Sequence, residues 1–422
     1  MEDLLNIRED LLNIREDFPL IDSGSAVGSG LTDGGSFAVG GSTPAPTPAS
    51  ASTPIPSRSL VYFDNAATTQ KPKVALDTII DYYTHINANV HRGVHHLSIL
   101  ATEAYEEARA TVQKFLNAKE SAEIIFTRGT TEAINLVAQC YGNTHIKKGD
   151  RVIVTVGEHH SNFVAWQQLC LRVGAEFVVI PIDRQGVLDM LRLETELKKG
   201  ARMLAVAHIY NVSGTLNPLR KIVDIAHRYG VIVLVDGAQG AAHTFVDVQQ
   251  LDCDFYTFSG HKVYAAMGIG VLYGKRLLLE DMPPYQFGGE MISEVSVERT
   301  TFNELPYKFE AGTPSVADAL TLSASLRYIL HIGLDRITAH EHALYTRAYA
   351  ALQAIDGIEI YSLPSVIPTA PASTHTHATA APAPATPILS TATHTTHALT
   401  APTLSPPTPT SNPAPTSNPA ST

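Results

Sequence analysis

Lys262 and Asp236 are the residues of this chain whose types and positions point most directly to chemistry. Lys262 ends the run FYTFSGHK, and Asp236 follows the apolar run VIVLV. A lysine amine can form a Schiff base with an aldehyde cofactor, whereas a buried carboxylate needs a cationic partner such as a protonated ring nitrogen. An aldehyde and a protonated ring occur together in pyridoxal phosphate (PLP). The pair therefore predicts a PLP site and chemistry on amino-acid substrates.

A candidate phosphate site follows an apolar segment that ends at Thr127. After a short Arg-Gly turn, Thr130 and Thr131 begin an expected helix, whose free amides and hydroxyl groups can bind an anion. Thr130 could instead serve only as a helix cap. Ser259 and His261 closely precede the lysine and supply further donors, which favours the phosphate interpretation.

Polar residues follow other expected strands as well. Gln239 lies just after Asp236 and is placed to hydrogen-bond a ring hydroxyl. His159 and His160 follow another apolar run, where an imidazole can stack on a ring or move protons. Asn211 follows a third run and would contact cofactor or substrate. Each residue alone has a plainer structural explanation, so the prediction depends on their combination.

Alternating strand and helix patterns predict an α/β fold with a mainly parallel sheet covered by helices. The expected strands are nearly continuous apolar runs, which is typical of parallel strands buried on both faces. Ligands of such sheets bind at the carboxyl ends of the strands, where the candidate residues lie. The expected strands are 123–127, 151–156, 176–180, 203–208, 231–236 and 268–273, and the expected helices are 102–116, 132–141, 163–173, 190–198 and 222–229.

Composition divides the chain into five segments. Residues 1–21 contain the repeat LLNIRED and predict a helical entry segment, and the Gly-, Ser- and Pro-rich residues 22–57 predict a linker or insert. Residues 58–315 are expected to form the large cofactor-binding domain. Residues 316–362, with a helical stretch at 316–352 and an expected strand at 357–361, would form a partial small domain. Residues 363–422 lack Asp, Glu, Lys and Arg and predict a disordered tail.

Bulk properties exclude several classes of partner. The 422 residues carry a formal net charge of −11, which argues against binding to nucleic acid or to an anionic membrane. The three cysteines lack disulfide or metal spacing, and the histidines of the tail are better explained as spacers than as ligands, so no metal site is expected. No apolar run is long enough to cross a bilayer. These features predict a cytoplasmic protein.

Eight stretches of the chain resemble a known family. They are similar, in family order, to group II (SufS-type) cysteine desulfurases, which belong to the class V aminotransferase-like PLP enzymes. The matching stretches are YFDNAATTQKP (62–72), NVHRGVHHLS (89–98), FTRGTTEAINLVA (126–138), EHHSNFVAWQ (158–167), NVSGTLNP (211–218), VDGAQGAAH (235–243), FSGHKVY (258–264) and FEAGTPS (309–315).

The resemblance implies a fold-type I PLP enzyme with a mainly parallel seven-stranded sheet, acting as a homodimer with its site near the subunit interface. It also implies a role for each candidate residue. Lys262 would carry the cofactor and move protons, His159 would stack on the ring, and Asp236 would pair with the ring nitrogen, while Gln239 would contact the phenolic oxygen.

The resemblance also implies residues for the phosphate and the substrate. The phosphate would be held by Thr130, Thr131, Ser259 and His261, and Thr313 would reach the phosphate of the partner subunit. The substrate carboxylate would lie near Asn211, Ala66 and Ala67, and His91 and Arg92 would lie near the substrate and the dimer contact.

The family reaction converts L-cysteine to L-alanine and passes the sulfur, as a persulfide, to an acceptor protein for iron–sulfur cluster assembly. Its nucleophilic cysteine lies in a C-terminal motif, Arg-x-Gly-x-x-Cys, close to an arginine that binds the substrate carboxylate. This chain has no cysteine after Cys253 and no arginine after Arg347. Cys140, Cys170 and Cys253 fall in the expected large domain and are predicted to be packed thiols.

Three functions therefore remain open on the sequence. The first is a cysteine desulfurase whose persulfide step is impaired. The second is a PLP-dependent selenocysteine or cysteine lyase, or an aminotransferase-like activity, which needs no nucleophilic thiol. The third is a catalytically dead, truncated product.

Overall fold

The structure is a computed structural model that describes residues 14, 17–19 and 61–362. Its centre is a seven-stranded sheet in the order β1-β7-β6-β5-β4-β2-β3. Strand β7 runs antiparallel to both of its neighbours, and the other pairs in the sheet are parallel. This confirms the predicted α/β class. The strands are β1 (Ile124–Thr127), β2 (Arg151–Thr155), β3 (Glu176–Ile180), β4 (Met203–Ala207), β5 (Ile232–Asp236), β6 (Phe255–Ser259) and β7 (Gly270–Gly274).

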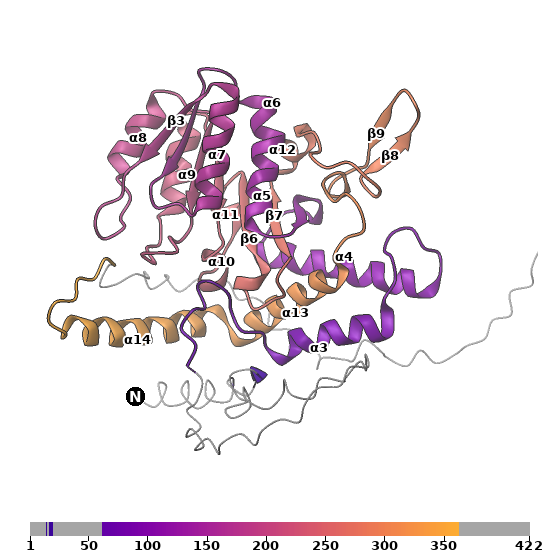
Figure 1. Ribbon diagram of the computed structural model, residues 1–422, viewed down its shortest axis with the longest axis horizontal. Coiled ribbons are helices and arrows are strands. Elements are labelled where there is room, and N and C mark those ends of the chain that lie inside the picture. Colours follow the sequence, from indigo (N-terminus) through magenta and orange to yellow (C-terminus); the bar gives the residue numbers. More distant parts are fainter. Residues whose placement is uncertain (1–13, 15–16, 20–60, 363–422) are drawn as a thin grey trace, which may run out of the picture. The chain divides into compact units, whose positions relative to one another are not determined.

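Successive residues of the central strands point to opposite faces of the sheet, as the pleat requires. In β5, Val233 and Val235 join one apolar cluster, whereas Leu234 joins the other. Helices cover both faces, so both sets of side chains are buried (Figure 1). The helices are α3 (Lys73–Asp81), α4 (His96–Leu116), α5 (Thr130–Val137), α6 (Asn143–His145), α7 (His160–Val173), α8 (Met190–Lys198), α9 (Leu219–Arg228), α10 (Gly240–His243), α11 (Val248–Leu251), α12 (Arg276–Asp281), α13 (Val316–Ile332) and α14 (Leu334–Gln353).

Several expected elements differ in detail. The helix expected at 132–141 starts earlier as α5 and continues as a π-helical turn, Ala138–Gly142. The stretch 316–352 is two helices, because Gly333 at φ 92° interrupts it. The strand expected at 357–361 is wrong: this segment has no strand partner within the described part of the chain, and Ile358 and Tyr361 are exposed. A short apolar run with nothing to pair with cannot form a ladder.

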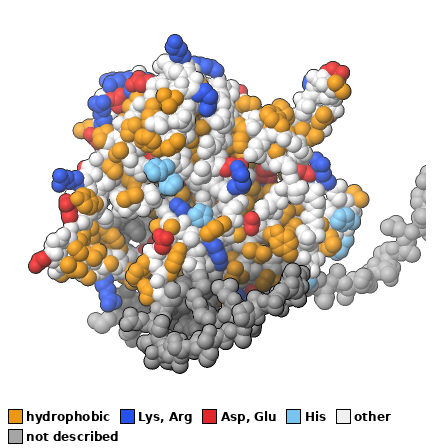
Figure 2. Space-filling model, in the orientation of Figure 1, with side chains coloured by type: hydrophobic (Ala, Val, Ile, Leu, Met, Phe, Trp, Pro, Cys, Tyr) orange, Lys and Arg blue, Asp and Glu red, His pale blue; other side chains and the backbone are white. Residues whose placement is uncertain are grey.

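Helix α14 buries none of its residues. Hydrophobic side chains gather over this helix at the lower left of Figure 2. Leu344 and Leu352 of α14 are exposed. A separate hairpin, β8 (Ile292–Val295) with β9 (Thr300–Phe302), extends away from the sheet (Figure 1). None of the described helices is long and apolar enough to cross a bilayer.

Most of segment 1–21 and all of segments 22–57 and 363–422 lie outside the described residues. The boundaries assigned to the large domain, 58–315, and to the partial small domain, 316–362, remain predictions.

A close backbone approach fixes the edge of the sheet beside the expected phosphate site. A Cβ atom on Gly270 would lie 2.4 Å from the Cα of Gly129 and 2.8 Å from the carbonyl oxygen of Phe258. Both obstacles are backbone atoms, so only glycine allows β7 to approach the turn that starts α5.

Replacing Gly270 with alanine is therefore expected to lower the free energy of unfolding by about 1–3 kcal/mol, because strand β7 or the turn at Gly129 must shift. Urea unfolding followed by circular dichroism measures this. Gly288→Ala is the matched control, since its added Cβ would meet only atoms at ordinary contact distance, 3.8 Å or more. Equal stability of the two variants would contradict the packing argument.

Candidate active site

One cavity of about 490 Å³ collects most of the predicted site residues. It lies at the carboxyl ends of β4, β5 and β6, where parallel strands of such folds bind ligands. The candidate residues that line it are Ala66, Ala67, Thr130, Thr131, His159, Asn211, Asp236, Gln239, Ser259, His261 and Lys262.

The chemical centre of the cavity is the pair Asp236 and Lys262. Asp236 ends β5, is only 4% exposed, and accepts a hydrogen bond from the amide of Ala238 at 2.9 Å. Burial raises the pKa of Asp236, and burial lowers the pKa of Lys262, while each charge partly offsets this effect on the other. A buried carboxylate with a single amide donor can accept a further cationic N–H, and a lysine with a lowered pKa is a better nucleophile. Both properties suit PLP.

The start of α5 forms a cradle for an anion. The Ser259 hydroxyl accepts a hydrogen bond from the Thr130 amide at 2.9 Å and donates one to the Thr130 hydroxyl at 2.9 Å. Thr131, next in the helix, also lines the cavity. His261 adds a buried Nδ1 that has no hydrogen-bond partner among the described residues. The hydroxyl protons of Thr130 and Thr131 and the unpaired imidazole nitrogen of His261 remain as donors that a phosphate group would satisfy.

His159 stands at the start of α7 with its tautomer fixed. Its Nδ1 accepts a hydrogen bond from the Ser161 amide at 3.2 Å, and because an amide can only donate, the neutral ring carries its proton on Nε2. Burial lowers the pKa of His159, although the negative charge of Asp236 opposes this. A neutral, oriented imidazole at the cavity wall is suited to stacking on an aromatic ring.

Glu158 is a residue of the site that sequence reasoning missed. It precedes His159 in the chain and is buried, and its carboxylate accepts hydrogen bonds from Thr155 at 2.7 Å, Asn162 at 2.6 Å and the amide of Ala207 at 3.1 Å. These partners join β2, β4 and α7. Burial raises the pKa of Glu158 to about 8 despite the three donors. A glutamate directly after an apolar strand was the available signal, but sequence could not show which groups surround it.

A second cavity of about 300 Å³ shares part of the first one's wall. Ala66, Asn211 and Gln239 line both, and α14 contributes further lining residues. The Gln239 side chain donates to the carbonyl oxygen of Ala66 at 2.8 Å, which ties the segment around Ala66 to the end of β5.

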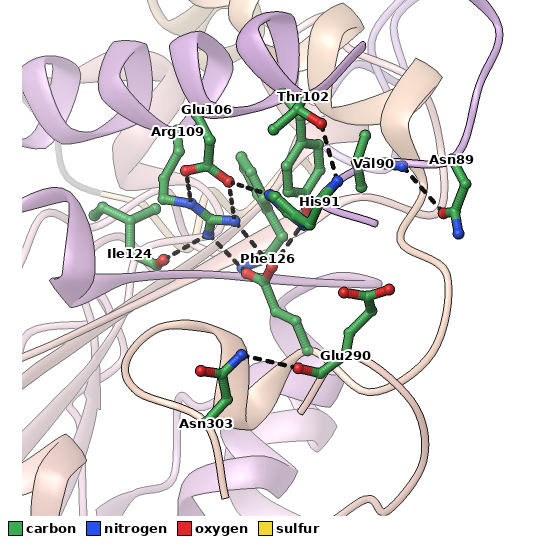
Figure 3. A network of polar contacts seen from close by, with 12 residues as sticks. Asn89, Val90, His91, Thr102, Glu106, Arg109, Ile124, Phe126, Glu290 and Asn303 are labelled. Carbon is green, nitrogen blue, oxygen red and sulfur yellow. Dashed lines mark hydrogen bonds and ion pairs between the residues drawn. The ribbon is translucent and has the colours of Figure 1, made fainter. Parts of the chain in front are cut away.

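Three predicted residues lie away from the cavity within this chain: His91, Arg92 and Thr313 do not line it. His91 contacts Glu106 at 3.0 Å (Figure 3). Arg92 pairs with Glu290 at 2.6 Å. The resemblance placed these residues near a dimer contact and a partner subunit, and those roles remain predictions.

Arg109 anchors the neighbouring network of Figure 3. It is 1% exposed, pairs with Glu310 at 2.7 Å and with Glu106 at 3.0 Å, and donates to the carbonyl oxygen of Ile124 at 2.9 Å. The same Glu310 carboxylate accepts from the Phe126 amide at 2.7 Å. This network connects β1 to the loop that continues to Thr313.

The three cysteines are packed thiols, as predicted. Cys140, Cys170 and Cys253 are 1%, 2% and 0% exposed and unpaired. Burial raises the pKa of Cys140 to about 12 and of Cys170 to about 11, and it raises the pKa of Cys253 further still. A protonated, inaccessible thiol is a poor nucleophile.

Asp236→Asn is expected to weaken PLP binding by roughly 10- to 100-fold, because an uncharged amide cannot form a charge-assisted hydrogen bond with a protonated ring nitrogen. Titration of the apoprotein with PLP, followed by visible absorbance, measures this. Asp224→Asn, on the exposed face of α9, should bind PLP as the unchanged chain does. Unchanged affinity of the Asp236 variant would contradict the assignment.

Glu158 should make stability depend on pH. Between the ordinary carboxyl pKa of 4.5 and about 8, the folded protein keeps a proton on Glu158 that the unfolded chain has lost. The free energy of unfolding therefore falls as pH rises through this window, by up to about 1.4 kcal/mol per pH unit. Glu158→Gln should make this slope shallower, whereas exposed Glu103→Gln should keep it. Urea unfolding at several pH values decides this, and identical slopes would refute the assignment.

Comparison with known proteins agrees with this geometry. The aminotransferase class-V family matches residues 61–382. A probable cysteine desulfurase of Halalkalibacterium halodurans is 48% identical over 302 residues, which is 72% of this chain and 74% of that protein. A cysteine desulfurase of Escherichia coli is 47% identical over 306 residues, 72% of this chain and 75% of that protein. The solved structure of the Escherichia coli cysteine desulfurase CsdA has a TM-score of 0.67 and 41% identity, covering 72% of this chain and 76% of that one. With a PLP-type cavity at the strand ends and relatives of this similarity, the chain belongs to the cysteine desulfurase family of the class-V aminotransferases.

Proposed function

We propose that this chain binds PLP in the 490 Å³ cavity and uses it to remove sulfur from L-cysteine. The observation that carries the proposal is the single cavity in which a lysine, a buried aspartate and a helix-start anion cradle meet. These groups match the amine, ring nitrogen and phosphate contacts that PLP requires. Selenocysteine, whose side chain differs from that of cysteine by one atom, is a second substrate of the same class.

The proposed roles follow from the positions of the side chains. PLP, when bound, supplies an electron sink for charge that develops at the substrate α-carbon. Lys262 Nζ holds the cofactor aldehyde and then moves the α-proton, a task helped by its lowered pKa. The Asp236 carboxylate holds a proton on the ring nitrogen, and the neutral His159 ring orients the cofactor by stacking.

The remaining contacts fix the cofactor and the substrate. Thr130, Thr131, Ser259 and His261 hold the phosphate, and Gln239 contacts the phenolic oxygen. Asn211, with the backbone at Ala66 and Ala67, lies beside the substrate carboxylate. We propose that His91, Arg92 and Thr313 complete the site across a homodimer interface, which agrees with their position outside the cavity of a single chain.

The sulfur must leave on a thiol that reaches the cavity. Transfer to a thiol RSH breaks the Cβ–S bond of cysteine, forms RS–SH and returns a proton to the substrate carbon to give alanine. Cys140, Cys170 and Cys253 are buried and hold raised pKa values, so none of them suits this step. We therefore propose that persulfide formation on the described part of the chain is impaired and that an external thiol or a cytoplasmic acceptor protein takes the sulfur.

The burial of these three thiols favours a lyase reaction as the alternative to sulfur transfer. A lyase that eliminates sulfide or selenide directly needs the lysine and the ring contacts but no protein thiol. It would release pyruvate and ammonia instead of alanine. An aminotransferase-like reaction would instead yield a keto acid with the sulfur still attached.

The products distinguish these reactions. The purified chain, supplied with PLP, L-cysteine and dithiothreitol, is expected to form alanine and sulfide in equal amounts, and Lys262→Ala should reduce both by at least ~1,000-fold. Lys198→Ala, on exposed α8, controls for the loss of a lysine. The triple variant Cys140→Ala, Cys170→Ala, Cys253→Ala should retain the activity per folded molecule. Pyruvate in place of alanine would assign the lyase reaction, and no product with bound PLP would indicate a catalytically dead chain.

A further inference from the structure

The turn that carries Lys262 adopts a conformation that needs support. After the single 3₁₀ turn Gly260–Lys262, Tyr264 has a φ of 66°. Bulky side chains rarely adopt this left-handed region, and such strain persists only where surrounding groups hold the backbone in place. The contacts around this turn should therefore reveal what fixes the direction of the lysine.

Thr69 supplies those contacts from a segment far away in the sequence. It is 6% exposed, and its amide donates to the carbonyl oxygen of His261 at 3.0 Å. Its hydroxyl donates to the same oxygen at 2.9 Å and accepts from the amide of Tyr264 at 3.0 Å. One side chain thus holds the backbone on both sides of Lys262, including the strained residue.

Lys71 binds the same carbonyl oxygen of His261. Its ammonium donates to the carbonyl oxygens of Thr69 at 2.6 Å and His261 at 3.3 Å. No ion pair joins Lys71 to a carboxylate within residues 61–362, and burial lowers its pKa to about 8. A half-buried cation whose partners are two backbone carbonyls serves to hold those carbonyls.

The same segment also positions a second cofactor contact. The carbonyl oxygen of Ala66 accepts the hydrogen bond of Gln239, and Ala66 lines the cavity. Residues 66–71 therefore connect the lysine turn, the end of β5 and the cavity wall through hydrogen bonds, rather than through side-chain packing alone.

We infer that Thr69, supported by Lys71, is a positioning residue: its hydroxyl holds the turn 261–264 so that the Lys262 amine faces the cofactor aldehyde. This inference depends on the proposed function, because it assigns Thr69 a role only if Lys262 holds PLP. Thr69 itself does not line the cavity. It acts through the backbone, so its removal should slow the capture of PLP without removing any cofactor contact.

The test compares Thr69→Val with Thr69→Ser. Valine keeps the shape and loses the hydroxyl, whereas serine keeps the hydroxyl. Apoprotein is mixed with excess PLP, and the rate of covalent capture is followed by visible absorbance at a temperature where circular dichroism shows every variant folded. Thr69→Val is expected to capture PLP about tenfold more slowly, as the loss of buried hydrogen bonds and of orientation implies, and Thr69→Ser should stay within about threefold of the unchanged chain.

Thr78→Val in α3 makes the same change outside the turn and should have no effect, because its hydroxyl only donates to Val74 within the helix. If Thr69→Val does not fold, Lys71→Met carries the test, with an expected slowing of about threefold. Capture of PLP by the Thr69 and Lys71 variants at the unchanged rate would overturn this inference and would leave the proposed function intact. Absence of covalent capture by the unchanged chain would instead overturn the proposed function.

Discussion

A buried carboxylate and a partly buried ammonium at the ends of neighbouring strands are the constraint on which this structure depends. Asp236 lies at the carboxyl end of β5, and Lys262 follows the end of β6, which pairs with it. A charge taken out of water is costly unless it has a partner, and each of these two groups partly offsets the effect of burial on the pKa of the other. The parallel sheet makes this possible, because it brings strand ends from distant parts of the chain to one edge.

Around this pair, hydrogen bonds between a side chain and a distant backbone group connect several segments of the chain. The amide of Thr130 donates to the Ser259 hydroxyl, and the amide of Phe126 donates to the Glu310 carboxylate. The carbonyl oxygen of His261 accepts hydrogen bonds from Thr69 and Lys71. Each of these bonds links segments more than a hundred residues apart. Polar links between distant segments therefore hold the structure around the cavity together. The ion pair of Arg109 and Glu310 links to β1 in the same way, through backbone groups of Ile124 and Phe126.

The sequence predicted the sheet and the cavity well for a physical reason. Buried parallel strands must be continuously apolar, and polar residues that line a cavity at their carboxyl ends must follow them, so the positions of Asp236, Asn211 and His159 could be predicted from the pattern. Prediction from the sequence was wrong where a segment needs a neighbouring segment in order to form its structure. The segment 357–361 has strand composition but no neighbouring strand. Thr69 and Lys71 went unnoticed because their partners are backbone atoms, which leave no periodic signal. Glu158 went unnoticed because the sequence does not show that it is buried between two strands and a helix.

The most direct test of the account is to find where the cofactor attaches. Holoprotein reduced with borohydride, which makes a Schiff base permanent, is digested and mapped by mass spectrometry. We expect one reduced pyridoxyl group per chain, on the peptide that contains Lys262, and none on the Lys262→Ala protein. A label on another lysine, or a Lys262→Ala protein that still acquires one, would contradict the account.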